Sequence, residues 1–212
     1  MRILSIDPGF NNFGIVVIDT INPTEILACG NVEIKTKTKG IREQIRAFRE
    51  ALWGTFLRHY MPFDLTIIEG QFKGALKIIE TICHCEFYPA LSIHPIKVKN
   101  FYEFKSISYR ANKAQSVEIS KLLCPDFEKQ CGMKRMHDVS DAYLQAIYFG
   151  IQSNHISKEF VNKLKEISVH NEPVVHEGSG SKPPVSTTDR GSPDDIESSD
   201  TNITGGAARE NV

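Results

Sequence analysis

The first fourteen residues, MRILSIDPGFNNFG, place one aspartate at the end of a short apolar run. The apolar run at residues 3–6 predicts a buried strand, and Pro8-Gly9 predicts a turn immediately after Asp7. A carboxylate at the end of a strand is exposed at the sheet surface and yet held by a rigid element. Catalytic carboxylates are often supported in this way. We therefore expect other functional groups of the chain to converge on Asp7.

Apolar runs and turn residues along the chain predict a mixed α/β domain over residues 1–169. Strands are expected at residues 2–6, 14–19, 26–34, 65–68 and 90–94. The close spacing of the first three favours an antiparallel meander, and the run at 65–68, apolar except for Thr66, indicates a central strand. Helices are expected at residues 40–59, 75–87, 112–123, 138–151 and 158–167.

Composition separates a second segment, residues 170–212, from this domain. Ser, Thr, Gly, Pro and acidic residues predominate there, which predicts a disordered tail. Because the tail is acidic and the whole chain has a net charge of −1, residues 1–169 are mildly basic, which permits a polyanionic partner. The sequence has no apolar run near the roughly 20 residues that span a membrane. The odd number of cysteines, five, favours reduced thiols and an intracellular location.

Four acidic residues carry the chemical signal. Asp7 and Glu69 each end an apolar strand, and Asp138 and Asp141 lie three residues apart, on one face of a helix. Each also has a structural interpretation, and Asp138 in particular suits the N-cap of its helix. Carboxylates at a strand end suffer desolvation and repulsion, both of which a divalent cation relieves. Oxygen-only ligands suit Mg²⁺ or Mn²⁺, and two such ions about 4 Å apart can hydrolyse a phosphodiester.

Four motifs, in this order, resemble the RuvC-type Holliday junction resolvases. They are IDPGxxxxG at residues 6–14, IEGQF at 68–72, RANK at 110–113 and HDVSDA at 137–142. The resemblance covers residues 1–151 and is greatest to the poxvirus-type branch found in large DNA viruses. It implies a ribonuclease H-like fold, with a five-stranded mixed sheet flanked by helices. It also implies a homodimer, in the cytoplasm or a viral replication compartment, that makes paired cuts across four-way DNA and leaves 5′-phosphate and 3′-hydroxyl ends.

The same resemblance assigns roles to single residues. The implied ligands of two Mg²⁺ ions, for which Mn²⁺ would substitute, are Asp7, Glu69, Asp138 and Asp141. The implied phosphate-binding residues are Lys97, Lys99 and Arg110. Lys113 would lie near the scissile phosphate, and Phe72 would lie against the junction centre. Simpler interpretations stay open: Phe72 could be a core residue, and the lysines could be solvated.

Other interpretations remain for the cysteines and for the function. Cys83-His84-Cys85 with Cys124 and Cys131 resembles a zinc set, although free thiols fit the unusual spacing as well. The alternative functions are a YqgF-like RNA nuclease of the same fold, an ATP-binding protein of the actin and sugar-kinase class, and a non-catalytic junction-binding module. The second needs a further phosphate-binding loop, and the sequence shows no match to one.

Overall fold

The computed structural model describes residues 1–160, except residues 10, 35–40, 55, 73, 105–107, 133–134 and 158. The tail predicted at residues 170–212, and nearly all of the helix predicted at 158–167, lie outside these described residues. Across the described ranges, no helix combines the length and the apolar character that a bilayer crossing requires.

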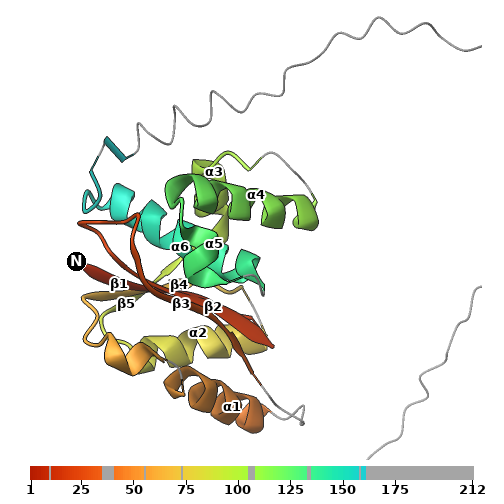
Figure 1. Cartoon of the computed structure of the whole chain (residues 1–212). Coiled ribbons are helices and arrows are strands. Elements are labelled where there is room, and N and C mark those ends of the chain that lie inside the picture. Colours follow the sequence, from red (N-terminus) through yellow and green to blue (C-terminus); the bar gives the residue numbers. More distant parts are fainter. Residues whose placement is uncertain are drawn as a thin grey trace, which may run out of the picture. The chain divides into compact units, whose positions relative to one another are not determined.

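A five-stranded mixed sheet forms the centre of the fold (Figure 1). Its strands, in the order in which they lie in the sheet, are β3 (Ile26–Glu33), β2 (Asn12–Asp19), β1 (Arg2–Asp7), β4 (Leu65–Glu69) and β5 (Ala90–Ile93). The first three along the chain are antiparallel, whereas β4 is parallel to β1 and β5 to β4. All five predicted strands are confirmed, and their order is that of the ribonuclease H-like fold. Strand β1 is the middle strand, and β4, which was predicted to be central, lies inside the sheet between β1 and β5.

Helices cover both faces of the sheet (Figure 1). One face carries α1 (Ile41–Trp53) and α2 (Ala75–Glu86), with a short 3₁₀ helix at Phe56–His59; the other carries α3 (Pro95–Phe101), α4 (Tyr109–Leu123), α5 (Phe127–Cys131) and α6 (Met136–Gln152). Strand β2 carries only apolar residues between Asn12 and Asp19 at its ends, because residues 13–18 are buried on both faces. Its side chains alternate, so that Phe13 and Val17 pack in the core under α1 and α2, and Val16 packs in the core under α6.

Two helices were not predicted, and one predicted helix is shorter. Pro95 ends strand β5 as expected, but it also opens α3, where its fixed φ suits the first turn. The ring of His94 caps that helix, with Nδ1 accepting from the N–H of Ile96 at 3.2 Å. The five-residue helix α5 is too short to show a period in sequence. The helix predicted at 40–59 ends at Trp53 and gives way to the 3₁₀ helix.

Candidate active site

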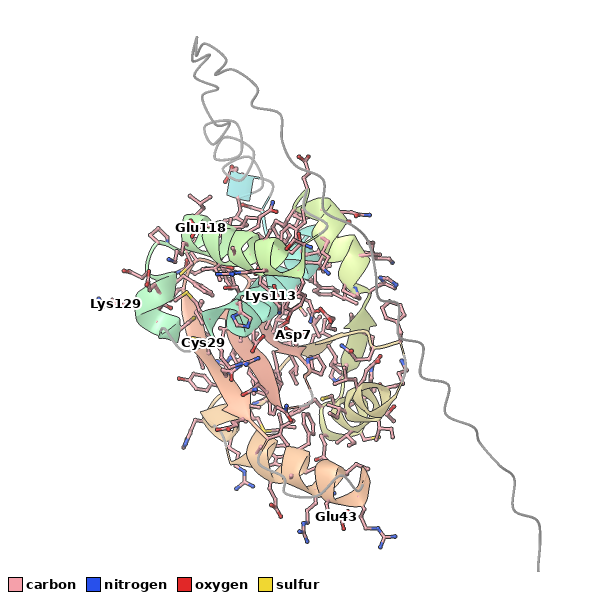
Figure 2. The ribbon with its side chains drawn as sticks, turned by 90° about the vertical axis from the view of Figure 1, so that its right-hand side faces the viewer. Asp7, Cys29, Glu43, Lys113, Glu118 and Lys129 are labelled. Carbon is pink, nitrogen blue, oxygen red and sulfur yellow. The ribbon has the colours of Figure 1, made fainter. Side chains whose placement is uncertain are left out.

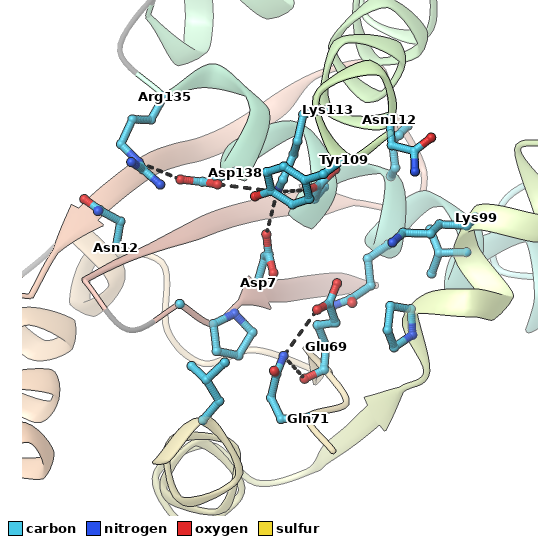
Figure 3. A pocket seen from close by; sticks show the side chains of 18 of the residues that line it. Asp7, Asn12, Glu69, Gln71, Lys99, Tyr109, Asn112, Lys113, Arg135 and Asp138 are labelled. Carbon is cyan, nitrogen blue, oxygen red and sulfur yellow. Dashed lines mark hydrogen bonds and ion pairs between the residues drawn. The ribbon is translucent and has the colours of Figure 1, made fainter. Parts of the chain in front are cut away.

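Asp7 and Glu69 are neighbours because β1 and β4 run parallel and in register. Ile6 pairs with Ile68, so the two acids that follow lie side by side at the carboxyl ends of adjacent strands. Adjacent strands are about 4.8 Å apart, and side chains at paired positions point to the same face. Figure 3 shows both carboxylates directed into one cavity.

Asp138 and Asp141 approach Asp7 because α6 packs tightly on β2 at Gly14. Gly14 pairs with Asp7 between β1 and β2, and a Cβ added to it would lie 2.1 Å from the backbone oxygen of Asp138. Only a residue without a side chain permits this contact. The glycine of the first motif therefore holds the start of α6 against the end of β1.

Replacing Gly14 with alanine should destabilise the protein by about 1–3 kcal/mol or more, because the new methyl group meets rigid backbone. Urea denaturation monitored by circular dichroism measures the loss. Gly70→Ala is the matched control, since its Cβ would lie 3.3 Å from the nearest atom, the oxygen of Ile93, and a smaller loss is expected. Equal losses at the two sites would contradict the packing role of Gly14.

A single ammonium group lies between the acids of β1 and α6. Lys113 extends from α4, and its Nζ is 3.7 Å from Oδ2 of Asp7 and 3.5 Å from Oδ1 of Asp138. The same nitrogen forms an ion pair with Asp141. Its side chain is only 18% exposed and lies 5.6 Å from the centroid of the Tyr109 ring. The interpretation of Lys113 as a solvated lysine is therefore wrong, and it belongs to the site (Figure 3).

Besides Lys113, three side chains fix the carboxylate of Asp138. Arg135 Nε lies 2.7 Å and Asn31 Nδ2 lies 3.0 Å from Oδ2, and His137 Nε2 lies 3.3 Å from Oδ1. Arg135, in a left-handed conformation with φ 51°, takes the N-cap position of α6, so Asp138 lies within the first turn and its interpretation as an N-cap is wrong. Asn31 and Arg135 were not predicted.

Glu69 is held through a separate chain of contacts. The side-chain amide of Gln71 donates to Oε1 of Glu69 at 3.2 Å, and the backbone N–H of Gln71 donates to Oε2 of Glu80 at 2.8 Å. Glu80 is buried and also accepts from Ser92 and from Lys77, the latter at 2.9 Å. These hydrogen bonds outweigh its burial, so that the pKa of Glu80 is lowered and it stays ionised. Gln71 and Glu80 were not predicted either.

The acids repel one another across the cavity. Burial, followed by the charges of Glu69 and Asp141, raises the pKa of Asp7 well above its ordinary value of 3.8, although Lys113 partly opposes the shift. Burial and the charge of Asp141 likewise raise the pKa of Glu69. Burial tends to lower the pKa of Lys113, but Asp141 and Asp7 raise it more. The site therefore favours additional positive charge.

The cavity has a volume of about 430 Å³. Six of the residues predicted to be functional line it: Asp7, Glu69, Lys99, Lys113, Asp138 and Asp141. Lys97 and Arg110 are exposed on α3 and α4 outside the lining. Phe72 is 70% exposed, with its ring centroid 4.7 Å from that of His94, so its interpretation as a core residue is wrong.

The donor set suits a hard divalent cation, since it consists of four carboxylates. Within residues 1–160, apart from the gaps given above, no three His, Cys, Asp or Glu side chains are grouped closely enough to ligate one ion. Lys113 instead supplies the positive charge between three of the acids. A cation that binds here would take over that role.

No protein-family model and no curated protein matches the sequence. Solved structures do match. RuvC of T. thermophilus in complex with a Holliday junction substrate has 13% identity and a TM-score of 0.46, over 72% of this chain and 96% of that chain. The structure of Thermus thermophilus RuvC has 12% identity and a TM-score of 0.47, over 71% of this chain and 95% of that chain. Fowlpox virus resolvase, crystallised with its substrate Holliday junction DNA, has 20% identity and a TM-score of 0.44, over 72% of this chain and 96% of that chain.

These structures represent the family, and the poxvirus-type branch, that the sequence motifs resemble. At such identities the likeness concerns the fold, and one fold serves many activities. The strand order and the cluster of acids define this chain more closely, as a ribonuclease H-like α/β protein with an acidic cavity at the ends of β1 and β4.

Proposed function

We propose that the protein is a metal-dependent endonuclease that resolves four-way and other branched DNA by hydrolysing phosphodiester bonds. One observation carries this proposal. Acids from three separate elements, β1, β4 and α6, line one cavity together with a lysine from α4. A purely structural role does not explain two largely buried carboxylates, those of Asp7 and Glu69, whose pKa values are raised by burial and by neighbouring acids, whereas active sites commonly have this property.

In this proposal the ligands of two Mg²⁺ ions are Asp7, Glu69, Asp138 and Asp141. Such ions, when bound, activate a water molecule and stabilise the leaving oxygen of the phosphodiester, giving 5′-phosphate and 3′-hydroxyl ends. Arg135 and Asn31 orient Asp138, and Gln71 orients Glu69. Lys113, when it is no longer paired with the acids, offsets the negative charge that develops on the phosphoryl oxygens.

Basic residues around the cavity would bind the DNA backbone. Lys99 lines the cavity, whereas Lys97 and Arg110 lie exposed on the neighbouring surface of α3 and α4. Since these contacts are to phosphates, the affinity for a four-way junction should fall steeply between 50 and 200 mM salt, by about 10³-fold or more if six phosphates are neutralised. Fluorescence anisotropy across that range measures the slope. A flat response would contradict phosphate binding by this surface.

In this proposal Phe72 would contact DNA, because its ring is 70% exposed and it follows Glu69 and Gln71 closely in the chain. We expect Phe72→Ala to change the free energy of unfolding by less than about 0.5 kcal/mol, since exposed side chains contribute little. It should slow cleavage of four-way junctions and leave affinity for plain duplex unchanged. Tyr88→Ala, at a residue that is 92% exposed on another part of the surface, is the control. Junction cleavage at the wild-type rate would exclude a role at the junction centre.

The function is tested by incubating the full chain with four labelled substrates: a synthetic four-way junction, a plain duplex, a single strand and an RNA hairpin. With Mg²⁺ we expect paired cuts in opposing strands of the junction, consistent with a homodimer whose two-fold axis matches that of the DNA. EDTA should abolish the cuts. Preferential cutting of the RNA would favour the RNA nuclease, and binding without cutting would make the protein a junction-binding module.

A further inference from the structure

Two cysteines from distant parts of the chain lie in contact on the α6 side of the sheet. The sulfur atoms of Cys29, on β3, and Cys131, the last residue of α5, are 2.7 Å apart. Figure 2 shows Cys29 beside the helix that carries Lys129. Non-bonded sulfur atoms pack much farther apart, and a disulfide bond measures about 2.05 Å. The backbones of β3 and α5 therefore already hold the two side chains at the separation from which a bond can form.

The surroundings of this pair favour reaction over inert packing. Both cysteines are half-buried, so a small oxidant can reach them, whereas the adjacent Cys124 is buried. The hydrogen bond between the two thiols lowers the pKa of Cys29, whereas the same contact and burial raise the pKa of Cys131, so Cys29 is the thiol of the pair that ionises first. A metal ion does not explain the cluster: the search of the described residues finds no three potential ligands placed to hold one. The zinc set considered from sequence is also wrong, because Cys83 lies in the core on one face of the sheet, whereas Cys124 and Cys131 lie on the other face.

We propose that Cys29 and Cys131 form a reversible disulfide, which makes this pair a site of oxidative modification. With a peroxide as oxidant, the Cys29 thiolate attacks one oxygen, the O–O bond breaks, and one water leaves after protonation. The Cys131 thiol then attacks the sulfenic sulfur of Cys29 and gives up its proton, the S–O bond breaks, and the hydroxyl group leaves with that proton as a second water. Each sulfur is oxidised by one electron and the peroxide is reduced by two. A small thiol reverses the reaction by exchange.

The bond would join the two segments that hold Asp138. Asn31 lies two residues after Cys29 on the same strand, and Arg135 lies four residues after Cys131, at the start of α6. Both side chains donate to Oδ2 of Asp138. A disulfide across this long stretch of chain restricts the unfolded state strongly and fixes β3 relative to the start of α6. The oxidised form should therefore be the more stable one.

The test treats the reduced full chain with a small excess of hydrogen peroxide at neutral pH. We expect the number of free thiols to fall from five to three, peptide mapping to find Cys29 joined to Cys131, and dithiothreitol to restore all five. The melting temperature should rise by about 5 °C or more on oxidation. Cys29 joined to Cys124, Cys29 joined to a second chain, or sulfinic acid at Cys29 without the bond would overturn the proposal.

Two variants separate this pair from general thiol oxidation. Cys131→Ser should abolish both the linked peptide and the rise in melting temperature. Cys85→Ser, at an exposed cysteine on α2, should leave both intact. A rise in melting temperature that persists in Cys131→Ser would show that another oxidation stabilises the protein, and a disulfide that forms without any rise would overturn the stabilising role. None of these measurements depends on nuclease activity.

Discussion

Replacing Asp7 with asparagine should slow junction cleavage by about 10³-fold or more and, without divalent cations, make the protein more stable at neutral pH. The loss of cleavage follows because Asp7 is the proposed ligand at the centre of the acids, and single groups that stabilise a transition state contribute factors of this size. The gain in stability, on the order of 1 kcal/mol, follows because a neutral amide avoids both the desolvation cost of the buried carboxylate and its repulsion by Glu69 and Asp141. Junction binding should persist.

The raised pKa of Asp7 also predicts how the free energy of unfolding depends on pH. Because the pKa of Asp7 is raised in the folded protein, the folded state holds a proton there that the unfolded chain has lost. The contribution of Asp7 to stability is therefore greatest below its ordinary pKa of 3.8 and falls as the pH rises through the raised value. Asp7→Asn should remove that decline from the curve of unfolding free energy against pH.

Asp19→Asn is the matched control, since the pKa of Asp19 is shifted in the direction opposite to that of Asp7. The backbone N–H of Ile21 and the N-terminal ammonium group lower the pKa of Asp19. Asp19→Asn should thus lose stability at neutral pH, and the loss should shrink as the pH falls through the lowered pKa. Urea denaturation at several pH values measures both curves. An Asp7→Asn variant that cuts like the wild type, or that is less stable at neutral pH, would contradict the role given to Asp7.

Replacing Lys113 with methionine should strengthen the binding of divalent cations by tenfold or more and weaken cleavage by about 10²-fold. The ammonium group now balances three acids, and one charge pair at about 4 Å contributes up to about 4 kcal/mol near a protein surface. Without it, a cation meets the full negative charge of the site. Cleavage falls nevertheless, because the proposed partner of the phosphoryl oxygens is missing.

Titration calorimetry with Mn²⁺ compares the cation affinity of the wild type and Lys113→Met. Lys121→Met, on the same helix and paired with Glu128 at 3.1 Å, should change neither cation affinity nor cleavage. Unchanged or weaker cation binding by Lys113→Met would show that the acids do not bind the cation where Lys113 lies.

The convergence of the acids was predictable from sequence because it follows from local rules. Asp7 and Glu69 end strands, and residues three apart share a helix face. The residues that orient them were not predictable in this way. Asn31 reaches Asp138 because of the register between β2 and β3. Arg135 reaches it because Arg135 itself adopts a left-handed conformation just before the first residue of α6. No periodic pattern encodes either of these features.

The burial of Glu80 and the exposure of Phe72 were likewise not predictable from residue type. A glutamate in an amphipathic helix is ordinarily solvated, yet Glu80 is buried because Ser92 and the backbone of Gln71 supply its hydrogen bonds. A phenylalanine is ordinarily buried, yet Phe72 is exposed. Tertiary contacts decide both cases, and the same contacts set the exposure on which a functional role depends.

Glu69 offers the most direct test that the acids act as one centre, because its place beside Asp7 rests on the register of β1 and β4 and not on an ion pair with Lys113. The measurement is single-turnover cleavage of an end-labelled four-way junction with Mg²⁺ by the wild type and by Glu69→Gln, at protein concentrations that saturate binding. We predict equal affinity for the junction and cleavage slowed by at least about 10²-fold in the variant. Cleavage by Glu69→Gln at the wild-type rate would contradict the proposed active site.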